Sequence, residues 1–298
     1  MNARKTLKEL LARKRLLLAP GAFDGLSARL VEEAGFEAVY LSGGSVARST
    51  GVPDLGLMTM SEVIDRAVQI VSAVKIPVIA DADTGYGNAL NVVRTVREFE
   101  RAGVAAIHIE DQVTPKRCGH LEGKEVIPLG EMENKLKVAL EARSDPDFMI
   151  IGRTDSRAIH GLDDAIQRGK AFGRLGADGI FVEAAESEKE LETIARAIRD
   201  VPLMVNMFKG GKTPLLPASR LEQMGYRIAI FPSDTQRAAI YAMKEALSVL
   251  KRDGSTSAID DRLTTFQERD RLIGLGEWEK LEERYLKNVD GKKEDEKS

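Results

Sequence analysis

Cysteine is almost missing from this sequence, which has a single one, Cys118, among its 298 residues. One cysteine cannot form an internal disulfide, which excludes disulfide-rich secreted scaffolds and is typical of a reducing cytoplasm. Long apolar runs are also missing, because none approaches the roughly 20 residues that a membrane helix needs. The N-terminus lacks the continuous apolar core and the small-residue cleavage site of a secretory signal. We therefore expect a cytoplasmic protein without a membrane partner.

Excess positive charge is equally absent, since the formal net charge is −3. Without a basic field, nucleic acid is not expected as a partner. Hydrophobic residues make up 43% and charged residues 31%, an ordinary profile for a soluble protein. The length fits one α/β barrel of about 250 residues plus a short extension.

The dominant pattern is a regular alternation of short apolar runs with amphipathic segments. Each run is apolar at successive positions, as in strands of a parallel sheet that is covered on both faces. Eight such runs occur: Leu16–Ala19, Ala38–Leu41, Val78–Ala80, Ala105–Ile109, Phe148–Ile151, Gly179–Val182, Leu203–Asn206 and Ile228–Phe231. Repeated right-handed β-α crossovers predict a closed (β/α)8 TIM-type barrel, and an open doubly wound sheet is the alternative.

Four of the intervening segments show clear helix boundaries. We predict a helix at Ser61–Val74 that starts on a capping serine, and one at Asn88–Arg101 that starts on a capping asparagine. Helices at Leu162–Leu175 and Ala218–Met224 are each followed by a glycine, which is a common stop signal.

The C-terminal part differs from residues 1–255, which we interpret as one catalytic barrel domain. Residues 256–287 are expected to form a helical extension, and the highly charged residues 288–298 to be disordered. Within Ile259–Tyr285 the pattern predicts one or two charged helices with apolar positions at Leu263, Phe266, Leu272, Leu275, Trp278 and Leu281. Because the barrel is already complete, another subunit is the expected packing partner of these side chains.

Acidic side chains follow neighbouring strands at the end where a β/α barrel builds its active site. Asp81 and Asp83 stand two apart, so on a strand both would point the same way, and Glu110 leaves the next strand. A further acid, Asp54, lies in a loop segment. Clustered carboxylates repel each other unless a cation lies between them, and oxygen ligands favour Mg²⁺, with Mn²⁺ as a possible substitute. Alternatively, these acids cap helices and accept hydrogen bonds from loops.

Other predicted strand ends also carry polar groups. Arg153 could bind a carboxylate with its planar guanidinium or pair with one of the acids, and the two uses can coexist. Glu183 and Asn206 stand at the ends of the sixth and seventh runs. After the second run, backbone N–H groups at residues 42–44 could bind an anion.

Cys118 lies in the polar segment TPKRCGHLEGK, which is typical of a mobile loop. Neighbouring basic side chains, including Lys116 and His120, are expected to lower the pKa of the thiol and make it reactive. One cysteine with one nearby histidine is too few ligands for a zinc site. His108 and His160 are interpreted as structural, with His160 at the start of a helix.

These motifs resemble those of the isocitrate lyase and phosphoenolpyruvate mutase superfamily. KRCGH at 116–120 and DADTGYGN at 81–88 are together highly specific. The similarity covers about residues 6–285 and includes PGAFDGLSA at 20–28, YLSGGS at 40–45, HIEDQ at 108–112, GRTD at 152–155 and NMFKGGKTP at 206–214. The small size and these patterns are most similar to the branch of 2-methylisocitrate lyase and 2,3-dimethylmalate lyase.

The resemblance implies a barrel whose eighth helix swaps into a neighbouring subunit, usually in a homotetramer. It implies Mg²⁺ held by Asp81, directly or through water, with Asp54, Asp83 and Glu110 around it. It also implies a gating loop at residues 116–120, on which Lys116 and His120 would serve catalysis. The implied substrate contacts are Ser42, Gly43, Gly44, Gly119, Arg153, Glu183, Asn206 and Arg237.

The reaction implied by the resemblance cleaves a small 2-hydroxy di- or tricarboxylate into a 2-oxo acid, such as pyruvate, and a second carboxylate. Mg²⁺ would polarise the substrate hydroxyl and its carboxylate. Tyr40 is a candidate for accepting the hydroxyl proton, and Cys118 would protonate the carbanion. A phosphonomutase of the carboxyphosphonoenolpyruvate type or an oxaloacetate decarboxylase could use the same metal geometry without a thiol acid. A non-catalytic sensor of small acids is an alternative from another class.

Two positions depart from the family pattern. Lys209 stands where many relatives have glutamate, and Gly152 stands where many have alanine. Residue 209 would lie near the variable end of the substrate, so its positive charge bears on the choice between substrates.

Overall fold

The computed structural model describes residues 2–13 and 15–286, so the charged tail predicted to be disordered lies outside the described residues. Eight parallel strands pair in chain order, and β1 also pairs with β8, which closes the sheet. The predicted (β/α)8 barrel is therefore confirmed, and the open-sheet alternative is wrong. The strands are β1 (Leu17–Ala22), β2 (Val39–Leu41), β3 (Val78–Asp81), β4 (Ala106–Glu110), β5 (Met149–Thr154), β6 (Gly179–Val182), β7 (Leu203–Asn206) and β8 (Tyr226–Phe231).

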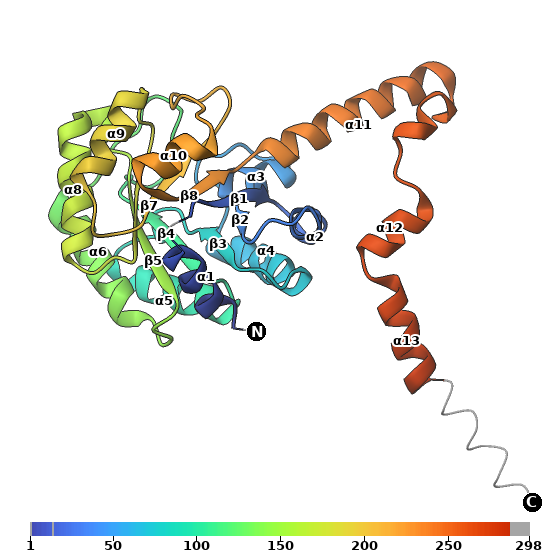
Figure 1. Cartoon of the computed structure of the whole chain (residues 1–298), viewed down its shortest axis with the longest axis horizontal. Coiled ribbons are helices and arrows are strands. Elements are labelled where there is room, and N and C mark those ends of the chain that lie inside the picture. The colour runs from blue at the N-terminus through green and yellow to red at the C-terminus, as the bar shows by residue number, and fades with distance from the viewer. Residues whose placement is uncertain (1, 14, 287–298) are drawn as a thin grey trace, which may run out of the picture. The chain divides into compact units, whose positions relative to one another are not determined.

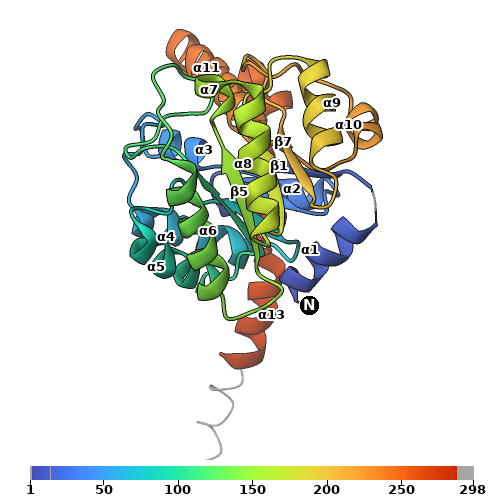
Figure 2. The ribbon, with the colours of Figure 1, turned by 90° about the vertical axis from the view of Figure 1, so that its left-hand side faces the viewer.

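Helices alternate with the strands and surround them, as Figure 1 and the turned view in Figure 2 show. Those of the barrel are α1 (Ala3–Ala12), α2 (Gly25–Glu33), α3 (Gly43–Ser49), α4 (Met60–Ala73), α5 (Ala89–Arg101), α6 (Leu129–Ala142), α7 (Arg157–His160), α8 (Leu162–Arg174), α9 (Glu188–Ala197) and α10 (Ala218–Met224). They are followed by α11 (Asp234–Asp253), a 3-10 helix (Ser257–Arg262), α12 (Phe266–Leu272) and α13 (Leu275–Tyr285).

Two helix boundaries differ from those predicted. The cap of α4 is Thr59 rather than Ser61, because the Thr59 hydroxyl accepts from the Glu62 N–H and the Glu62 carboxylate accepts from the Thr59 N–H. This reciprocal capping box satisfies two helix donors at once. His160 ends the short helix α7 instead of starting a helix.

Two layers of apolar side chains stabilise the barrel. The larger layer fills the space between the strands and the outer helices and includes Phe99 and Phe172. The smaller layer fills the interior of the barrel and also contains Leu7, Leu10 and Leu11 of α1. Because α1 closes the end at which the strands begin, only the end at which they finish is open for a site.

The chain forms two compact units, residues 1–238 and residues 239–298. The first holds the barrel, and the second holds most of α11 together with α12 and α13. Large apolar side chains in the second unit are exposed, among them Phe266 at 66% and Trp278 at 68%. The division at residues 255 and 287 stays a prediction. In the part of the chain that the structure describes, no helix combines the length and apolar character needed to cross a bilayer.

The packing around β5 explains why residue 152 is glycine and not alanine. A Cβ added there would lie 2.8 Å from Cδ2 of Phe172, a fully buried side chain of α8. The Phe172 ring therefore occupies the space that an alanine methyl group needs. We predict that Gly152→Ala lowers the free energy of unfolding by about 1–3 kcal/mol, the usual cost of overpacking a core.

Gly130→Ala is the matched control for this prediction. A Cβ added to Gly130 meets nothing within 4 Å, and the residue lies in the first turn of α6. Since alanine is the better helix former, the control should keep the wild-type stability or gain up to about 1 kcal/mol. Chemical denaturation of the three proteins measures both effects. Equal stability of Gly152→Ala and wild type would contradict the packing argument.

Candidate active site

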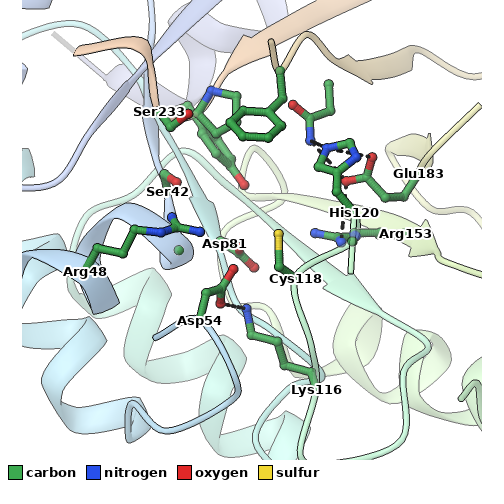
Figure 3. A pocket seen from close by; sticks show the side chains of 16 residues that line it. Ser42, Arg48, Asp54, Asp81, Lys116, Cys118, His120, Arg153, Glu183 and Ser233 are labelled. Atoms are coloured by element: carbon green, nitrogen blue, oxygen red, sulfur yellow. Dashed lines mark hydrogen bonds and ion pairs between the residues drawn. The ribbon is translucent and has the colours of Figure 1, made fainter. Parts of the chain in front are cut away.

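A small pocket opens at the end of the barrel where the strands finish, with a cavity volume of ≈ 60 Å³. Figure 3 shows Ser42 and Arg48 on one side of it and Cys118, Arg153 and Glu183 on the other. The lining residues are Tyr40, Ser42, Gly44, Arg48, Asp54, Asp81, Lys116, Cys118, Gly119, His120, Arg153, Glu183, Asn206, Phe208, Pro232 and Ser233. Most of the residues predicted from strand ends and motifs are therefore brought together here.

Three predicted residues lie just behind the wall of the pocket. A Cβ added to Gly43 would be 2.8 Å from the Asp81 carboxylate, so only glycine permits this close approach. Asp83 lies against Lys116, and Glu110 lies against Arg153. These residues support the lining side chains without lining the pocket themselves.

Arg237 and Lys209 are not among the lining residues. The Arg237 guanidinium donates to the Lys209 carbonyl over 2.8 Å and lies 5.7 Å from the centre of the Phe208 ring. The Lys209 side chain is exposed. Neither side chain therefore lines the pocket in this structure, and the roles expected for Arg237 and Lys209 toward substrate stay predictions.

The acids after β3 are arranged by a turn and not by the strand. β3 ends at Asp81, and Asp83 adopts a left-handed backbone with φ of 47°, so the expectation that both lie on a strand is wrong. The Asp83 N–H donates to Asp81 Oδ1 over 3.0 Å, which holds the turn. Lys116 Nζ lies 2.8 Å from Asp83 Oδ1 and 2.6 Å from Asp54 Oδ1. Lys116 thus bridges two of the predicted metal-site carboxylates.

Asp81 is the carboxylate most firmly held in its ionised form. Burial alone would raise its pKa, but neighbouring positive charge outweighs burial and lowers the pKa to about 2. His108 lies 3.7 Å away, yet burial lowers the pKa of His108 to about 4, so this ring is neutral at pH 7. The charges that act on Asp81 at neutral pH are therefore those of Lys116 and Arg153. By contrast, burial raises the pKa of Asp83 to about 6.

Arg153 is buried among three carboxylates at the end of β5. Its guanidinium nitrogens lie 3.1 Å from Glu110, 2.9 Å from Asp155 and 3.5 Å from Glu183. The register of the barrel pairs Arg153 with Glu110 on β4, which fixes one of these contacts. Burial opposes the positive charge, but the three acids outweigh it and raise the pKa of Arg153. The internal ion pairs predicted for this side chain are present, and it also lines the pocket.

The oxygen donors fit a hydrated cation better than a metal held wholly by protein. Among residues 2–13 and 15–286, no three His, Cys, Asp or Glu side chains gather closely enough to hold a metal ion by themselves. Oε1 of Glu110 is nevertheless buried without a hydrogen-bond partner from the described residues. Mg²⁺ takes one or two carboxylates and keeps several waters, which could satisfy such an oxygen. Asp81 could be the direct ligand, with Asp54, Asp83 and Glu110 holding waters.

The environment of the Cys118 thiol differs from the expectation. Burial, and after it the negative charge of Asp54, raises the pKa of the thiol. The predicted lowering by basic neighbours is wrong, because Lys116 turns toward Asp54 and Asp83 instead. Cys118 therefore presents a protonated thiol to the pocket at neutral pH.

Side chains from both flanks hold the loop that carries Cys118. The Gln112 amide donates to the carbonyl of Arg117 and accepts from its N–H, each over 2.9 Å. Lys124 Nζ donates to the carbonyls of Gly119 and Leu121, each over 2.6 Å. These contacts seat the thiol at the pocket. The gating motion of this loop stays a prediction.

His120 joins the same loop to the segment after β7. Its ring stacks on Phe208 with 5.1 Å between ring centres, and its Nδ1 accepts from the Lys212 N–H over 3.2 Å. Its Nε2 lies 3.3 Å from the Asn206 amide nitrogen. A Cβ added to Gly211 would lie 2.6 Å from the ring, so glycine is needed to accept it. His120 therefore connects the loop that carries Cys118 to the segment that follows β7.

Tyr40 is paired with a buried histidine. The Tyr40 hydroxyl lies 2.9 Å from His108 Nε2. Burial first, and the negative charge of Asp81 second, raise the pKa of Tyr40 well above its usual value, so the phenol is neutral. A neutral phenol can take up a proton only by giving away its own. Tyr40 could therefore act as a proton acceptor only together with His108.

Four lining residues were not predicted from the sequence: Arg48, Phe208, Pro232 and Ser233. Three of them follow β7 or β8, so the strand-end rule that located the other residues could have found them. Arg48 lies on α3, one helical turn after Gly44, where that rule gives no signal.

Comparisons with known proteins identify the family that has this arrangement. The family model described as phosphoenolpyruvate phosphomutase matches residues 7–251. The 2,3-dimethylmalate lyase of Eubacterium barkeri is 46% identical over 286 residues, which cover 96% of this chain and 99% of that protein. The 2-methylisocitrate lyase of Bacillus subtilis (strain 168) is 40% identical over 296 residues, which cover 97% of each.

Solved structures share the fold along nearly the whole chain. A crystal structure of 2,3-dimethylmalate lyase, a PEP mutase/isocitrate lyase superfamily member, has a TM-score of 0.91 and 38% identity and covers 96% of both chains. Phosphonopyruvate hydrolase in complex with oxalate and Mg²⁺ has a TM-score of 0.88 and 32% identity, with 96% of this chain and 100% of that one covered. This chain therefore belongs to the phosphoenolpyruvate mutase/isocitrate lyase superfamily.

Proposed function

We propose that this protein is a Mg²⁺-dependent carbon–carbon lyase. Its substrate is a small 2-hydroxy di- or tricarboxylate of the 2,3-dimethylmalate or 2-methylisocitrate type. Its products are a 2-oxo acid such as pyruvate and a second carboxylate. The names of relatives at 40% and 46% identity support the reaction, and a superfamily structure with Mg²⁺ supports the metal. Mn²⁺ has similar ligand preferences and could replace it.

The observation that carries this proposal is the position and protonation of the Cys118 thiol. Cys118 shares a small pocket with Asp81 and Arg153, and burial raises its pKa. Cleavage of a carbon–carbon bond beside a carboxylate leaves a carbanion that must gain a proton. A thiol that keeps its proton at neutral pH is a suitable general acid for this step.

The binding groups surround the position where charge develops on oxygen. Mg²⁺, when bound near Asp81, supplies Lewis-acid polarisation of the substrate hydroxyl and carboxylate. Gly43 and Gly44, the first residues of α3, offer backbone N–H groups to the same oxygens. On the opposite wall the Asn206 amide donates to Glu183 over 3.1 Å, which orients both side chains toward the other substrate half.

Proton transfer can be followed through the chain's own residues. Tyr40 takes the hydroxyl proton of the substrate while its own proton passes to His108, 2.9 Å away. The carbon–carbon bond then breaks, and the electron pair stays on the carbon beside the leaving carboxylate. Cys118 gives its proton to that carbon. Lys116 and His120 hold the loop that positions the thiol.

A phosphonomutase and an oxaloacetate decarboxylase are the competing enzymes on this scaffold. The name of the matching family model and the phosphonopyruvate hydrolase structure support the first of these. Both reactions could use Asp81 and the α3 backbone in the same way. The phosphonomutase reaction protonates no carbon, so the protonated Cys118 favours the lyase over it. Decarboxylation of oxaloacetate also leaves a carbon that must gain a proton, and there the names of the relatives favour the lyase.

Turnover of four acids by the purified protein with Mg²⁺ separates these reactions. We expect pyruvate to form faster from 2,3-dimethylmalate or 2-methylisocitrate than from oxaloacetate, and phosphonopyruvate to be inert. Fastest turnover of phosphonopyruvate or oxaloacetate would replace the lyase by a competing enzyme. Binding of these acids without any turnover would identify a non-catalytic sensor.

We also propose that the protein is a cytoplasmic homotetramer in which the C-terminal helices pack on a neighbouring subunit. Large apolar side chains of the second unit support this, including Tyr241 and Leu247 of α11, which are 74% and 64% exposed. Burying such side chains on folding or assembly is strongly favourable. Light scattering should give four times the chain mass, and a monomer in solution would overturn the proposal.

A further inference from the structure

Arg153 lies in the pocket wall on the side of Cys118, and its ability to bind a carboxylate depends on where its guanidinium points (Figure 3). One edge of the guanidinium is already occupied by the chain. Nε donates to Asp155 Oδ2 over 2.9 Å, and Nη2 donates to Asp155 Oδ1 over 3.2 Å. Two hydrogen bonds to the two oxygens of one carboxylate fix the plane of a guanidinium as well as its position. Asp155 therefore determines which donors of Arg153 face the pocket.

Asp155 follows β5, and a buried acid at the end of the neighbouring strand holds its backbone. Asp111, the residue after β4, accepts from the Asp155 N–H through Oδ1 over 2.9 Å. Its other oxygen, Oδ2, accepts from the Thr154 hydroxyl over 2.7 Å. Two consecutive residues at the end of β5 thus bind the same carboxylate. Asp111 is fully buried and is not among the lining residues, so it acts on the pocket only through its neighbours.

A second arginine holds Asp111 from the outer layer of helices. Arg168 of α8 donates from Nη1 to Asp111 Oδ2 over 3.1 Å and to the Ile127 carbonyl over 2.9 Å. Its Nε donates to Asp164 Oδ2 over 2.8 Å, and the Ser156 hydroxyl pairs with the same oxygen. A buried carboxylate needs such a partner, because an unpaired buried charge is strongly destabilising. The Asp111 carboxylate is therefore fixed between α8 and the turn that carries Asp155.

We propose that Asp111 is a positioning residue, which aims the Arg153 guanidinium at a substrate carboxylate by fixing Asp155. The inference rests on the proposed lyase function for the identity of the substrate, and it extends to any small carboxylate that Arg153 binds. Only a carboxylate offers one oxygen to each of two turn donors while it carries the charge that pairs with Arg168. Without the bond to the Asp155 N–H the turn can shift, and a shift of about 1 Å in a group that positions substrate can cost about 10²-fold in rate.

Asp111→Asn tests this role with almost no change in shape. Oδ2 receives two donors, one of them the charged Arg168, so the single oxygen of asparagine should take that place. The amide nitrogen then faces the Asp155 N–H, where two donors meet without an acceptor. kcat/KM for the best substrate should fall by about 10- to 100-fold, mainly through KM, because Arg153 binds the carboxylate before any bond breaks. Asp111→Ala removes both oxygens and should lose at least as much.

Thr154→Val is the matched control, because it removes a different bond to the same carboxylate. The Thr154 hydroxyl donates to Asp111 Oδ2 and accepts from the Ser156 N–H, whereas the Asp155 N–H stays in place. The Tm of the control should fall, as should that of Asp111→Asn, but its KM should remain that of the wild type. Unchanged KM in both Asp111 variants, or an equal rise of KM in Thr154→Val, would make Asp111 a merely structural residue.

A double-mutant cycle shows whether Asp111 acts through Asp155, and it needs no turnover. Calorimetry with Mg²⁺ measures the affinity of oxalate, the smallest dicarboxylate. Asp111→Asn and Asp155→Asn should each weaken binding by about tenfold or more. The double variant should bind no more weakly than Asp155→Asn alone, because residues that act through one contact are not additive. Additive losses, or a wild type that binds no oxalate, would overturn the role of Asp111. The expected cycle in a protein that cleaves neither 2,3-dimethylmalate nor 2-methylisocitrate would reject the lyase and retain Asp111 as a positioning residue.

Discussion

Cys118→Ser is expected to lower turnover of the best substrate by about 10²–10⁴-fold, the usual contribution of a general acid. Serine is similar in size to cysteine, so the loop contacts made by Gln112 and Lys124 can still form. KM should therefore change little. The serine hydroxyl is a much weaker acid than the thiol, so it donates poorly to a carbanion. Measurement of kcat and KM for the wild type and the variant checks this.

Cys118→Ala is the matched control, because it removes every acidic proton at this position and should be as slow as the serine variant. Alkylation gives an independent readout of the thiol. Burial raises the pKa of the Cys118 thiol. The rate of inactivation by iodoacetamide should therefore rise with pH, with a midpoint above about 8.5, the usual pKa of a free cysteine. Near-normal turnover by Cys118→Ser would exclude the thiol acid and move the decarboxylase or mutase ahead.

Removal of divalent metal is expected to lower activity by at least about 10³-fold, since Lewis-acid stabilisation is typically worth several kcal/mol. Addition of Mg²⁺ or Mn²⁺ to the chelated protein should restore turnover. Asp81→Ala should stay inactive at high Mg²⁺, because it removes the carboxylate that is held ionised at the pocket wall. The assay is turnover after treatment with EDTA, followed by titration with each metal. Full activity in the chelated, metal-free protein would contradict the metal site.

Melting temperature separates a metal ligand from a structural acid. A metal that binds only the folded protein raises its stability, so Mg²⁺ should raise the Tm of the wild type. The Tm of Asp81→Ala should not respond to Mg²⁺. In chelator the variant should melt below the wild type, because it loses the charges of Lys116 and Arg153 that favour the ionised Asp81 and the hydrogen bond from the Asp83 N–H. A Tm of the variant that still rises with Mg²⁺ would exclude Asp81 as a metal ligand.

The fold and the location of the site follow from simple patterns in the sequence. Strands that are covered on both faces consist of short apolar runs. Each of the eight runs in the sequence overlaps one of the eight strands of the structure. Active-site residues of a β/α barrel follow the ends of its strands. Asp81, Arg153 and Asn206 were found in this way, and all of them line the pocket.

The features that could not be predicted depend on contacts between distant segments. Cys118 has basic neighbours in sequence, but folding turns Lys116 toward Asp54 and buries the thiol, so its pKa rises. Asp83 follows a strand residue, but the strand has ended and a left-handed turn begins. Arg48 lies on a short helix, and only the fold brings it over the pocket. Spacing along the chain carries no information about these approaches.

The most direct test of the central claim is product analysis by NMR after reaction with Mg²⁺ in D₂O. Cleavage of 2,3-dimethylmalate should give equal amounts of pyruvate and propionate, and 2-methylisocitrate should give pyruvate and succinate. The second acid should carry one deuterium on the carbon that was protonated, because the exchangeable thiol of Cys118 delivers a solvent-derived proton. Absence of pyruvate from both acids, or a second acid without deuterium, would contradict cleavage through a protonated carbanion.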